Sequence, residues 1–272
     1  MIGAREIALA NLTILDVSPP DVVDAAAAAG FDSVTLRLAG GGTGDPNPLI
    51  GDTRARRETI ARLRHHGLGV LDVEVVRIVE DIDLAALGPI FESACALGAR
   101  HVLVTNQDPD EARAVERFAA ICAQAEALAL VPALEFMVFT ATKRVEQADR
   151  IVERAGHPAG RVLVDPLHLQ RSGGAPEDVS VLAAAHPERY PYAQLCDAPL
   201  VAPEGGGRAL YAEAVQNRLA PGDGQLPLAE LLEALPAGIP LSIETPVAAV
   251  AGLTEVQRAR HAMQATRRLL ER

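Results

Sequence analysis

The sequence has few aromatic residues and few cysteines, and it lacks a long apolar run of the kind that membrane proteins need. Its 272 residues include no tryptophan, 3% aromatic side chains and three cysteines, Cys95, Cys122 and Cys196. The cysteines are far apart, odd in number and form no CxxC pair, a pattern typical of ordinary buried thiols in a reducing compartment. No apolar run approaches the roughly 18 residues of a membrane span, and Glu6 falls where a signal peptide would have its apolar core. We therefore expect a cytoplasmic protein that does not cross a membrane.

Basic charge is also scarce. The chain has 36 acidic against 25 basic residues and a formal net charge of −11. This charge argues against nucleic acid or an anionic membrane as the main partner, although local arginines could still form a positive pocket for a small anionic substrate. Lys143 is the only lysine. Because it falls at a predicted helix start rather than inside a strand, a Schiff-base aldolase is disfavoured.

Apolar residues, by contrast, are abundant and regularly spaced. With 49% hydrophobic and 22% charged residues, the chain can bury a large core. Apolar runs with the length of buried strands occur at residues 7–15, 33–38, 69–76, 101–105, 130–136, 161–165, 192–197 and 239–244. Each is followed by a segment that predicts a helix, at residues 21–29, 53–66, 83–97, 110–129, 143–155, 177–185, 228–235 and 254–270.

This unbroken alternation of strands and helices predicts one α/β domain over residues 1–272, a single (β/α)₈ TIM barrel. A doubly wound open sheet is the competing fold, but residues 10–16, after the first predicted strand, contain no GxGxxG turn. Residues 40–48, GGGTGDPNP, form a loop that is long enough to close over a site. A surface loop without such a role is an equal alternative.

Oxygen-bearing side chains end four consecutive predicted strands. They are Glu135, Asp165, Gln194 and Glu244, and Asp197 follows Gln194 on the same strand. In a barrel of this kind the strands deliver their active-site residues at their C-terminal ends. Three carboxylates held together would repel one another unless a cation lies among them. Such a set suits Mn²⁺ or Mg²⁺, with Co²⁺ or Zn²⁺ as alternatives, although Asp165 taken alone could merely cap a turn.

Other charged residues are candidates for substrate contacts. His168 lies three residues after Asp165, near the predicted rim, and is either an acid–base group or a solvent-facing turn residue. Arg218 precedes a Pro-Gly-Asp-Gly turn and suits a carboxylate, phosphate or hydroxyl-rich substrate, unless it is a surface arginine. Arg37 and Glu74, at predicted strand ends, either line the pocket or form a structural ion pair. Arg171, with the turn at 172–174, could shape the rim or an oligomer contact.

Several of these segments together resemble the xylose isomerase-like TIM-barrel superfamily. They are LEF at 134–136, VDPLH at 164–168, QLCD at 194–197, RLAPGDG at 218–224 and IETP at 243–246. The superfamily contains sugar phosphate isomerases and epimerases, inosose dehydratases and 3-dehydroshikimate dehydratases. An apurinic endonuclease relative is disfavoured, since it would need more histidine ligands and a basic face.

The resemblance implies roles for individual residues. Glu135, Asp165 and Glu244 would bind the divalent metal, and His168 would contact the substrate or metal-bound water and could move a proton. The seventh-strand ligand is a histidine in many epimerases, whereas Gln194 is similar to that of some dehydratase-type members. Relatives are commonly dimers or tetramers, so the resemblance also implies a homo-oligomer.

These observations predict a metal-dependent isomerase or epimerase of a sugar or polyol-type hydroxy-ketone, acting through an enediolate on a small polyhydroxy or keto-acid substrate. Glu135 and Glu244 are the expected ligand-and-base residues, with His168 as a further acid–base group and Arg218 orienting the substrate. The first alternative is a metal-dependent dehydratase of a cyclic keto-polyol such as 3-dehydroshikimate or an inosose. A non-catalytic sugar-binding barrel is the alternative from a different class.

Overall fold

Eight parallel strands form a nearly closed barrel in the computed structural model, which describes residues 5–38 and 47–271. The strands are β1 (Ile7–Leu9), β2 (Ser33–Arg37), β3 (Gly69–Ile78), β4 (Ala99–Asn106), β5 (Val131–Glu135), β6 (Arg161–Leu163), β7 (Ala193–Leu195) and β8 (Leu241–Ile243). Their order is β6-β5-β4-β3-β2-β1-β8-β7. A single bridge between Val164 and Ala193 closes the gap between β6 and β7. The predicted TIM-barrel fold is confirmed, whereas the 40–48 loop lies mostly outside the described residues.

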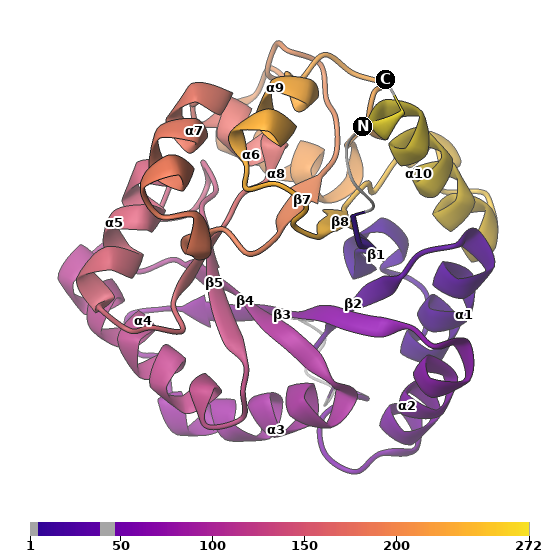
Figure 1. Cartoon of the computed structure of the whole chain (residues 1–272), viewed down its shortest axis with the longest axis horizontal. Helices are drawn as coiled ribbons and strands as arrows, with labels where there is room; N and C mark the ends of the chain where they lie inside the picture. Colours follow the sequence, from indigo (N-terminus) through magenta and orange to yellow (C-terminus); the bar gives the residue numbers. More distant parts are fainter. Residues whose placement is uncertain (1–4, 39–46, 272) are drawn as a thin grey trace.

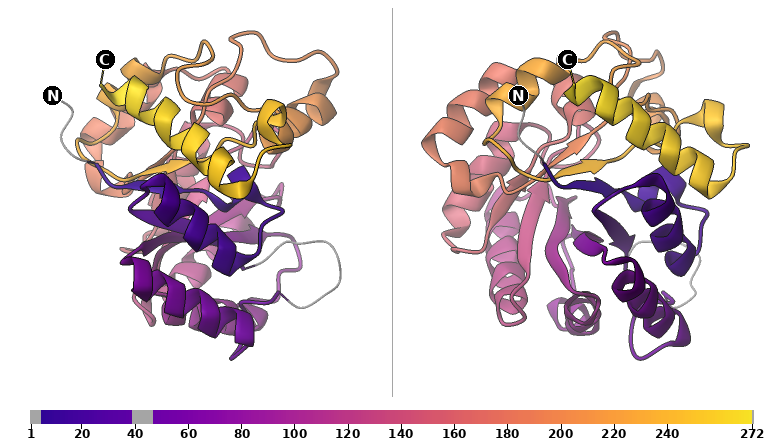
Figure 2. Two further views of the ribbon diagram at one scale, coloured as in Figure 1. Left: turned by 90° about the vertical axis from the view of Figure 1, so that its right-hand side faces the viewer. Right: turned by 45° about the vertical axis from the view of Figure 1, so that its right-hand side comes forward.

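Helices surround the strands on the outside (Figure 1). They are α1 (Pro19–Ala29), α2 (Arg54–His66), α3 (Gly88–Leu97), α4 (Glu111–Glu126), α5 (Val145–Ala155), α6 (Pro166–Arg171), α7 (Pro176–Ala185), α8 (Gly206–Gln216), α9 (Leu228–Ala234) and α10 (Glu255–Leu270). The last helix, α10, lies against the first, α1, and so completes the ring (Figure 2). No helix within 5–38 or 47–271 has both the length and the apolar character needed to cross a membrane.

The sequence signals at helix ends agree with the structure. Thr53 and Asp110 cap α2 and α4 by accepting backbone N–H bonds from Arg56 and Arg113. Gly30 ends α1 in the left-handed conformation, with φ of 82°, which a residue with a Cβ rarely adopts. These local signals explain why most of the helix boundaries could be predicted within a few residues.

Three features of the fold differ from the prediction. The first strand was expected to reach residue 15 but ends at Leu9, and residues Asn11–Ile14 form a 3₁₀ helix. An apolar run alone does not distinguish a strand from a tight helix. The predicted helix at 83–97 divides into a 3₁₀ turn, Leu84–Leu87, and α3, which carries Pro89 in its first turn. Helices α6 and α8 were not predicted.

The barrel floor below the strand ends is partly polar. Asp72 of β3 and His101 of β4 are paired in register, and the His101 ring stacks on Tyr192 with 4.7 Å between ring centroids. Burial lowers the pKa of His101 to about 4. His101 is 9% exposed and is thus a buried polar residue of the barrel interior. This floor separates the site at the strand ends from the N-terminal face of the barrel.

Candidate active site

A pocket of about 520 Å³ opens at the C-terminal ends of the strands. Six of the residues predicted from the sequence line it: Arg37, Glu74, Glu135, His168, Arg218 and Glu244. The volume is that of a small-molecule site. We describe it as two sides: the acidic side comprises Glu135, Asp165, His168, Gln194 and Glu244, and the basic side comprises Arg37, Glu74, Arg77, Thr105 and Gln107.

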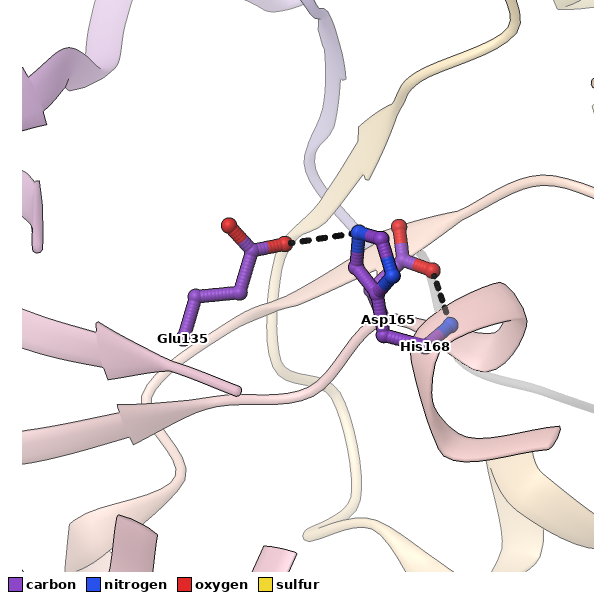
Figure 3. A group of neighbouring side chains, drawn as sticks. All are labelled: Glu135, Asp165 and His168. Carbon is purple, nitrogen blue, oxygen red and sulfur yellow. Dashed lines mark hydrogen bonds and ion pairs between the residues drawn. The ribbon is translucent and has the colours of Figure 1, made fainter. Parts of the chain in front are cut away.

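The acidic side is almost completely buried. None of its five residues is more than 4% exposed. Ligand atoms of Glu135, Asp165 and His168 lie within 4.8 Å of one another, close enough to share a metal ion (Figure 3). His168 Nε2 lies 3.8 Å from Glu135 Oε1. Four consecutive strand ends therefore bring their polar side chains together, as expected for a barrel.

Asp165 has both of its carboxylate oxygens engaged. One oxygen caps α6 by accepting the backbone N–H groups of Leu167, at 2.7 Å, and His168, at 3.1 Å. The other accepts a hydrogen bond from the Arg218 guanidinium. Asp165 thus caps the following helix, one of the two alternatives considered for it, while its role as a metal ligand stays a prediction. Asp-Pro at the start of α6 is a known helix-start pattern, which could have predicted this helix.

His168 and Arg218 lie deeper than predicted. His168 was expected near the rim but is 2% exposed within α6. Arg218 lines the pocket, and its guanidinium also bridges Asp165 and Glu244, 2.7 Å from the latter, while its Nε donates to the Ala214 carbonyl. The antiparallel bridge between Leu219 and Asp197 turns this segment inward. A bridge between segments that are distant in the sequence has no local sequence pattern, so the position of Arg218 could not be predicted.

Burial and charge shift the pKa values of the acidic side in different directions. Burial, together with the charges of Glu244 and Asp165, raises the pKa of Glu135 well above its usual range. Burial likewise raises the pKa of Glu244 to about 7 against the opposing charge of Arg218. For Asp165 the effect of burial is outweighed by Arg218 and His168, so its pKa is lowered. The pKa values of Glu135 and Glu244 are thus raised, whereas that of Asp165 is lowered.

His168 is an uncharged imidazole in this environment. Burial is the main cause of the lowering of its pKa to about 4, with the charge of Arg218 adding to it and Asp165 opposing it. The ring packs edge-on against Phe139, 5.5 Å between centroids, and Phe139 in turn contacts Tyr211. Burial therefore favours the neutral ring, which can accept a hydrogen bond or hold a proton briefly during a transfer.

The acidic side fits a divalent cation. Glu135 Oε1 and Gln194 Oε1 are buried and have no hydrogen-bond partner within the described part of the chain. Gln194 donates through Nε2 to Glu244 Oε1 at 3.1 Å, which leaves its carbonyl oxygen available. Carboxylate and amide oxygens are suitable donors for Mn²⁺ or Mg²⁺. Since Arg218 occupies oxygens of Asp165 and Glu244, a metal ion using the whole predicted set would compete with it.

The basic side contains the predicted pair and residues that sequence reasoning missed. Arg37 Nη2 lies 2.9 Å from Glu74 Oε2, and Thr35 donates to Glu74 Oε1 at 2.6 Å. These residues thus form an ion pair and also line the pocket. Arg77 and Thr105, which line the same pocket, were not identified. Thr105 is the last residue of its predicted strand, so the rule that found Glu135 could have found it, whereas Arg77 lies beyond the end of the predicted strand.

Two other candidates stabilise loops rather than the pocket. Asp197 accepts the backbone N–H groups of Ala198, Gly222, Gly224 and Leu226. Arg171 pairs with Glu213 at 2.7 Å and donates to the carbonyls at 199 and 200, so it joins α6 to α8 inside the protein instead of shaping a rim. Lys143 is exposed and does not line the pocket.

Comparisons with known proteins agree with this fold. The family model described as xylose isomerase-like TIM barrel matches residues 23–269. The solved structure of an IolI protein with a bound zinc atom superposes with a TM-score of 0.83 at 17% identity, covering 98% of each chain. No curated protein matches the sequence significantly.

Two further solved structures differ in the activity attributed to them. The probable 3-DHS dehydratase AsbF of Bacillus anthracis superposes with a TM-score of 0.74 at 14% identity, covering 96% of this chain and 98% of that one. A D-allulose 3-epimerase of Methylomonas sp. in complex with D-allulose gives a TM-score of 0.67 at 13% identity, covering 98% of both chains. Identities this low support the shared fold and leave the reaction open.

Proposed function

The chain belongs to the xylose isomerase-like TIM-barrel family, and from this premise we propose that it is a divalent-metal-dependent isomerase or epimerase of a sugar or polyol-type hydroxy-ketone. The observation that carries the proposal is geometric: Glu135 on β5 and Glu244 after β8 line one pocket, and ligand atoms of Glu135, Asp165 and His168 lie within 4.8 Å of one another. Isomerisation and epimerisation both need a group that removes a proton beside a carbonyl and a second group that returns one.

Each side chain has a proposed part in this chemistry. Glu135 and Glu244 act as proton carriers from different sides of the substrate carbon. His168, uncharged and 3.8 Å from Glu135, moves a proton at a substrate hydroxyl. A divalent ion, Mn²⁺ or Mg²⁺ with Co²⁺ or Zn²⁺ as alternatives, held by Glu135, Asp165, Gln194 and Glu244, would stabilise the negative charge that develops on the carbonyl oxygen. In the metal-free protein Arg218 holds Asp165 and Glu244 in place, and once these carboxylates bind the metal Arg218 would orient the substrate from the pocket wall.

A dehydratase is the second candidate, and Gln194 is the observation that favours it. The resemblance implies a histidine at this position in many epimerases, whereas Gln194 is similar to the residue of some dehydratase-type members. Glu135 would remove the proton and pass it through His168 to a neighbouring hydroxyl, which leaves as water, so that a conjugated enone or diene forms. Dehydration would use the same side chains as isomerisation. Only the product therefore distinguishes a dehydratase from an isomerase.

Solvent deuterium and ultraviolet absorbance test the proposal together. The Mg²⁺-loaded protein would be incubated in D₂O with dihydroxyacetone, D-fructose and D-fructose 6-phosphate, and separately with 3-dehydroshikimate. An isomerase exchanges the hydrogen beside the carbonyl, measured by proton NMR, with no change in absorbance. A dehydratase removes water from 3-dehydroshikimate, which is already an enone, and the extended conjugation of the product raises the ultraviolet absorbance at longer wavelength. Neither signal with any compound would contradict both and favour a sugar-binding barrel.

Metal analysis tests the site independently of turnover. Glu135→Gln and Asp165→Asn are expected to lower the metal content of the purified protein, since each removes a charged ligand. Glu230→Gln, an exposed carboxylate on α9, is the matched control and should retain the wild-type content. Unchanged metal in both site variants would contradict a metal centre at this position.

A further inference from the structure

Arg77 is a pocket residue to which the proposed chemistry gives no role. It lies near the end of β3, lines the same pocket as Glu135 and Glu244, and is exposed. Within residues 5–38 and 47–271 it makes no ion pair or hydrogen bond, whereas the neighbouring Arg37 is held by Glu74. Partial burial and the positive charge of Arg37 lower the pKa of Arg77. An anion in the pocket would relieve this repulsion.

A second, independent observation lies on the adjacent strand. Thr105 of β4 is the in-register partner of Arg77, lines the same pocket and is 2% exposed. Its Oγ1 is buried without a hydrogen-bond partner in the part of the chain that the structure describes. A buried hydroxyl without a partner is costly, which indicates that a ligand completes its bonding. Gln107, two residues further on, also lines the pocket.

We infer that Arg77 and Thr105, with Arg37 and Gln107 beside them, bind an anionic group of the substrate, a carboxylate or a phosphate. Arginine presents a planar set of N–H donors that matches both anions, and the threonine hydroxyl supplies a further donor. This inference rests on the proposed function, which places the hydroxy-carbonyl end of the substrate at the acidic side. It adds that the substrate is a charged hydroxy-carbonyl compound rather than a neutral sugar.

The strand register also limits the size of this substrate. Thr105 pairs in register with Glu135 on β5, so Arg77 and Glu135 lie on strands separated by one. With about 4.8 Å between neighbouring strands, their backbones are about 10 Å apart. A molecule of monosaccharide size can therefore place its anionic group at Arg77 and its hydroxy-carbonyl group at the acidic side.

Three matched probes test the anion site by calorimetric titration. D-glucitol is neutral, D-gluconate carries a carboxylate at one end, and D-glucitol 6-phosphate carries a phosphate. Titrations would use the full chain, with and without Mg²⁺, in low-chloride buffer. The wild-type protein is expected to bind at least one anion about tenfold more tightly than glucitol, the effect of one hydrogen bond to a charged group. The preferred anion identifies the source as carboxylate or phosphate.

Two variants at Arg77 and one control make the result specific. Arg77→Gln should reduce the anion preference about tenfold and leave glucitol binding unchanged, while Arg77→Lys should retain part of the preference. Arg64→Gln, an exposed arginine on α2, removes the same charge outside the pocket and should behave as wild type. No preference for either anion in the wild type, or an equal preference in Arg77→Gln, would overturn the inference.

The outcome can be separated from the proposed reaction. Anion preference that depends on Arg77, with no deuterium exchange or dehydration, would support the anion site and contradict the enzymatic function. Exchange with neutral sugars and no role for Arg77 would support the function and contradict the anion site. Thr105→Val, which keeps the shape and removes the hydroxyl, should weaken anion binding by a smaller factor than Arg77→Gln.

Discussion

The acidic side of the pocket neutralises its carboxylates within the chain, whereas the basic side leaves a guanidinium at the pocket surface. Arg218 lies between Asp165 and Glu244 and is 2% exposed. Arg77 is exposed and has no carboxylate partner within residues 5–38 and 47–271. Charge on the acidic side is therefore part of the folded structure, while charge on the basic side is available to a ligand. Mutations on the two sides should accordingly affect different measurements.

Removing Arg218 should have the largest effect on stability. In metal-free Arg218→Met, two buried carboxylates lose their counter-ion, and we expect the free energy of unfolding to fall by about 3–5 kcal/mol, as measured by urea denaturation. Added Mn²⁺ should restore part of this loss, because a bound cation replaces the missing charge. A loss below about 1 kcal/mol in the metal-free protein would mean that Arg218 is not the cation that the acidic side requires.

Glu135→Gln should separate stability from function on the same side. Glu135 Oε1 has no hydrogen-bond partner in the described chain, and like charges surround it. The neutral amide is therefore expected to leave the metal-free protein as stable as wild type or more stable by about 1 kcal/mol. Deuterium exchange into the substrate should fall at least about 100-fold. Strong destabilisation would show instead that the Glu135 carboxylate supports the fold.

The floor beneath both sides should make stability depend on pH. The pKa of His101 is about 4 when folded and about 6.5 when unfolded. As the pH falls below about 6.5 the unfolded chain binds the proton first, so the stability due to neutral His101 is lost progressively down to about pH 4. Between pH 7 and pH 5 this amounts to about 2 kcal/mol. Denaturation curves of wild type and His101→Gln should differ in slope over this range, and parallel curves would contradict the shift.

Arg77→Gln should have the smallest effect on the fold. Because the side chain is exposed and has no partner among the described residues, its loss should change the free energy of unfolding by no more than about 0.5 kcal/mol. Urea denaturation in parallel with Arg218→Met would compare the two sides directly. A loss above about 2 kcal/mol would mean that Arg77 is a structural cation like Arg218, and the contrast between the sides would disappear.

The sequence predicted the barrel and the strand ends because both depend on local periodicity. Apolar runs, caps and glycine stops recur along the chain, and the barrel topology alone brings Glu135, Asp165, Gln194 and Glu244 to one level. The use of these four residues as metal ligands stays a prediction. That residues 1–272 form a single domain also stays a prediction. The positions of α8 and Arg218 depend on pairing between distant segments, such as Leu219 with Asp197, which no local pattern encodes.

Arg77 escaped prediction for another reason. The strand at 69–76 was expected to end before it, and the observed strand continues to Ile78 with a shift in register between Val73 and Val76. This irregularity allows Glu74, Val75 and Arg77 all to line the pocket. A regular strand would send alternate residues to opposite faces, and strict alternation therefore misplaces part of the basic side.

The loop that follows β7 has a consequence for the speed of metal loading. Asp197 accepts four backbone N–H groups from this loop, and Gly224 approaches it so closely that a Cβ there would lie 2.4 Å from Asp197 Oδ1. The backbone beside Arg218 is thereby fixed. Exchange of Arg218 for a metal ion must then take place within a fixed backbone, and the buried guanidinium has to leave both Asp165 and Glu244. We expect metal loading to be limited by this side-chain step rather than by diffusion of the ion to the pocket.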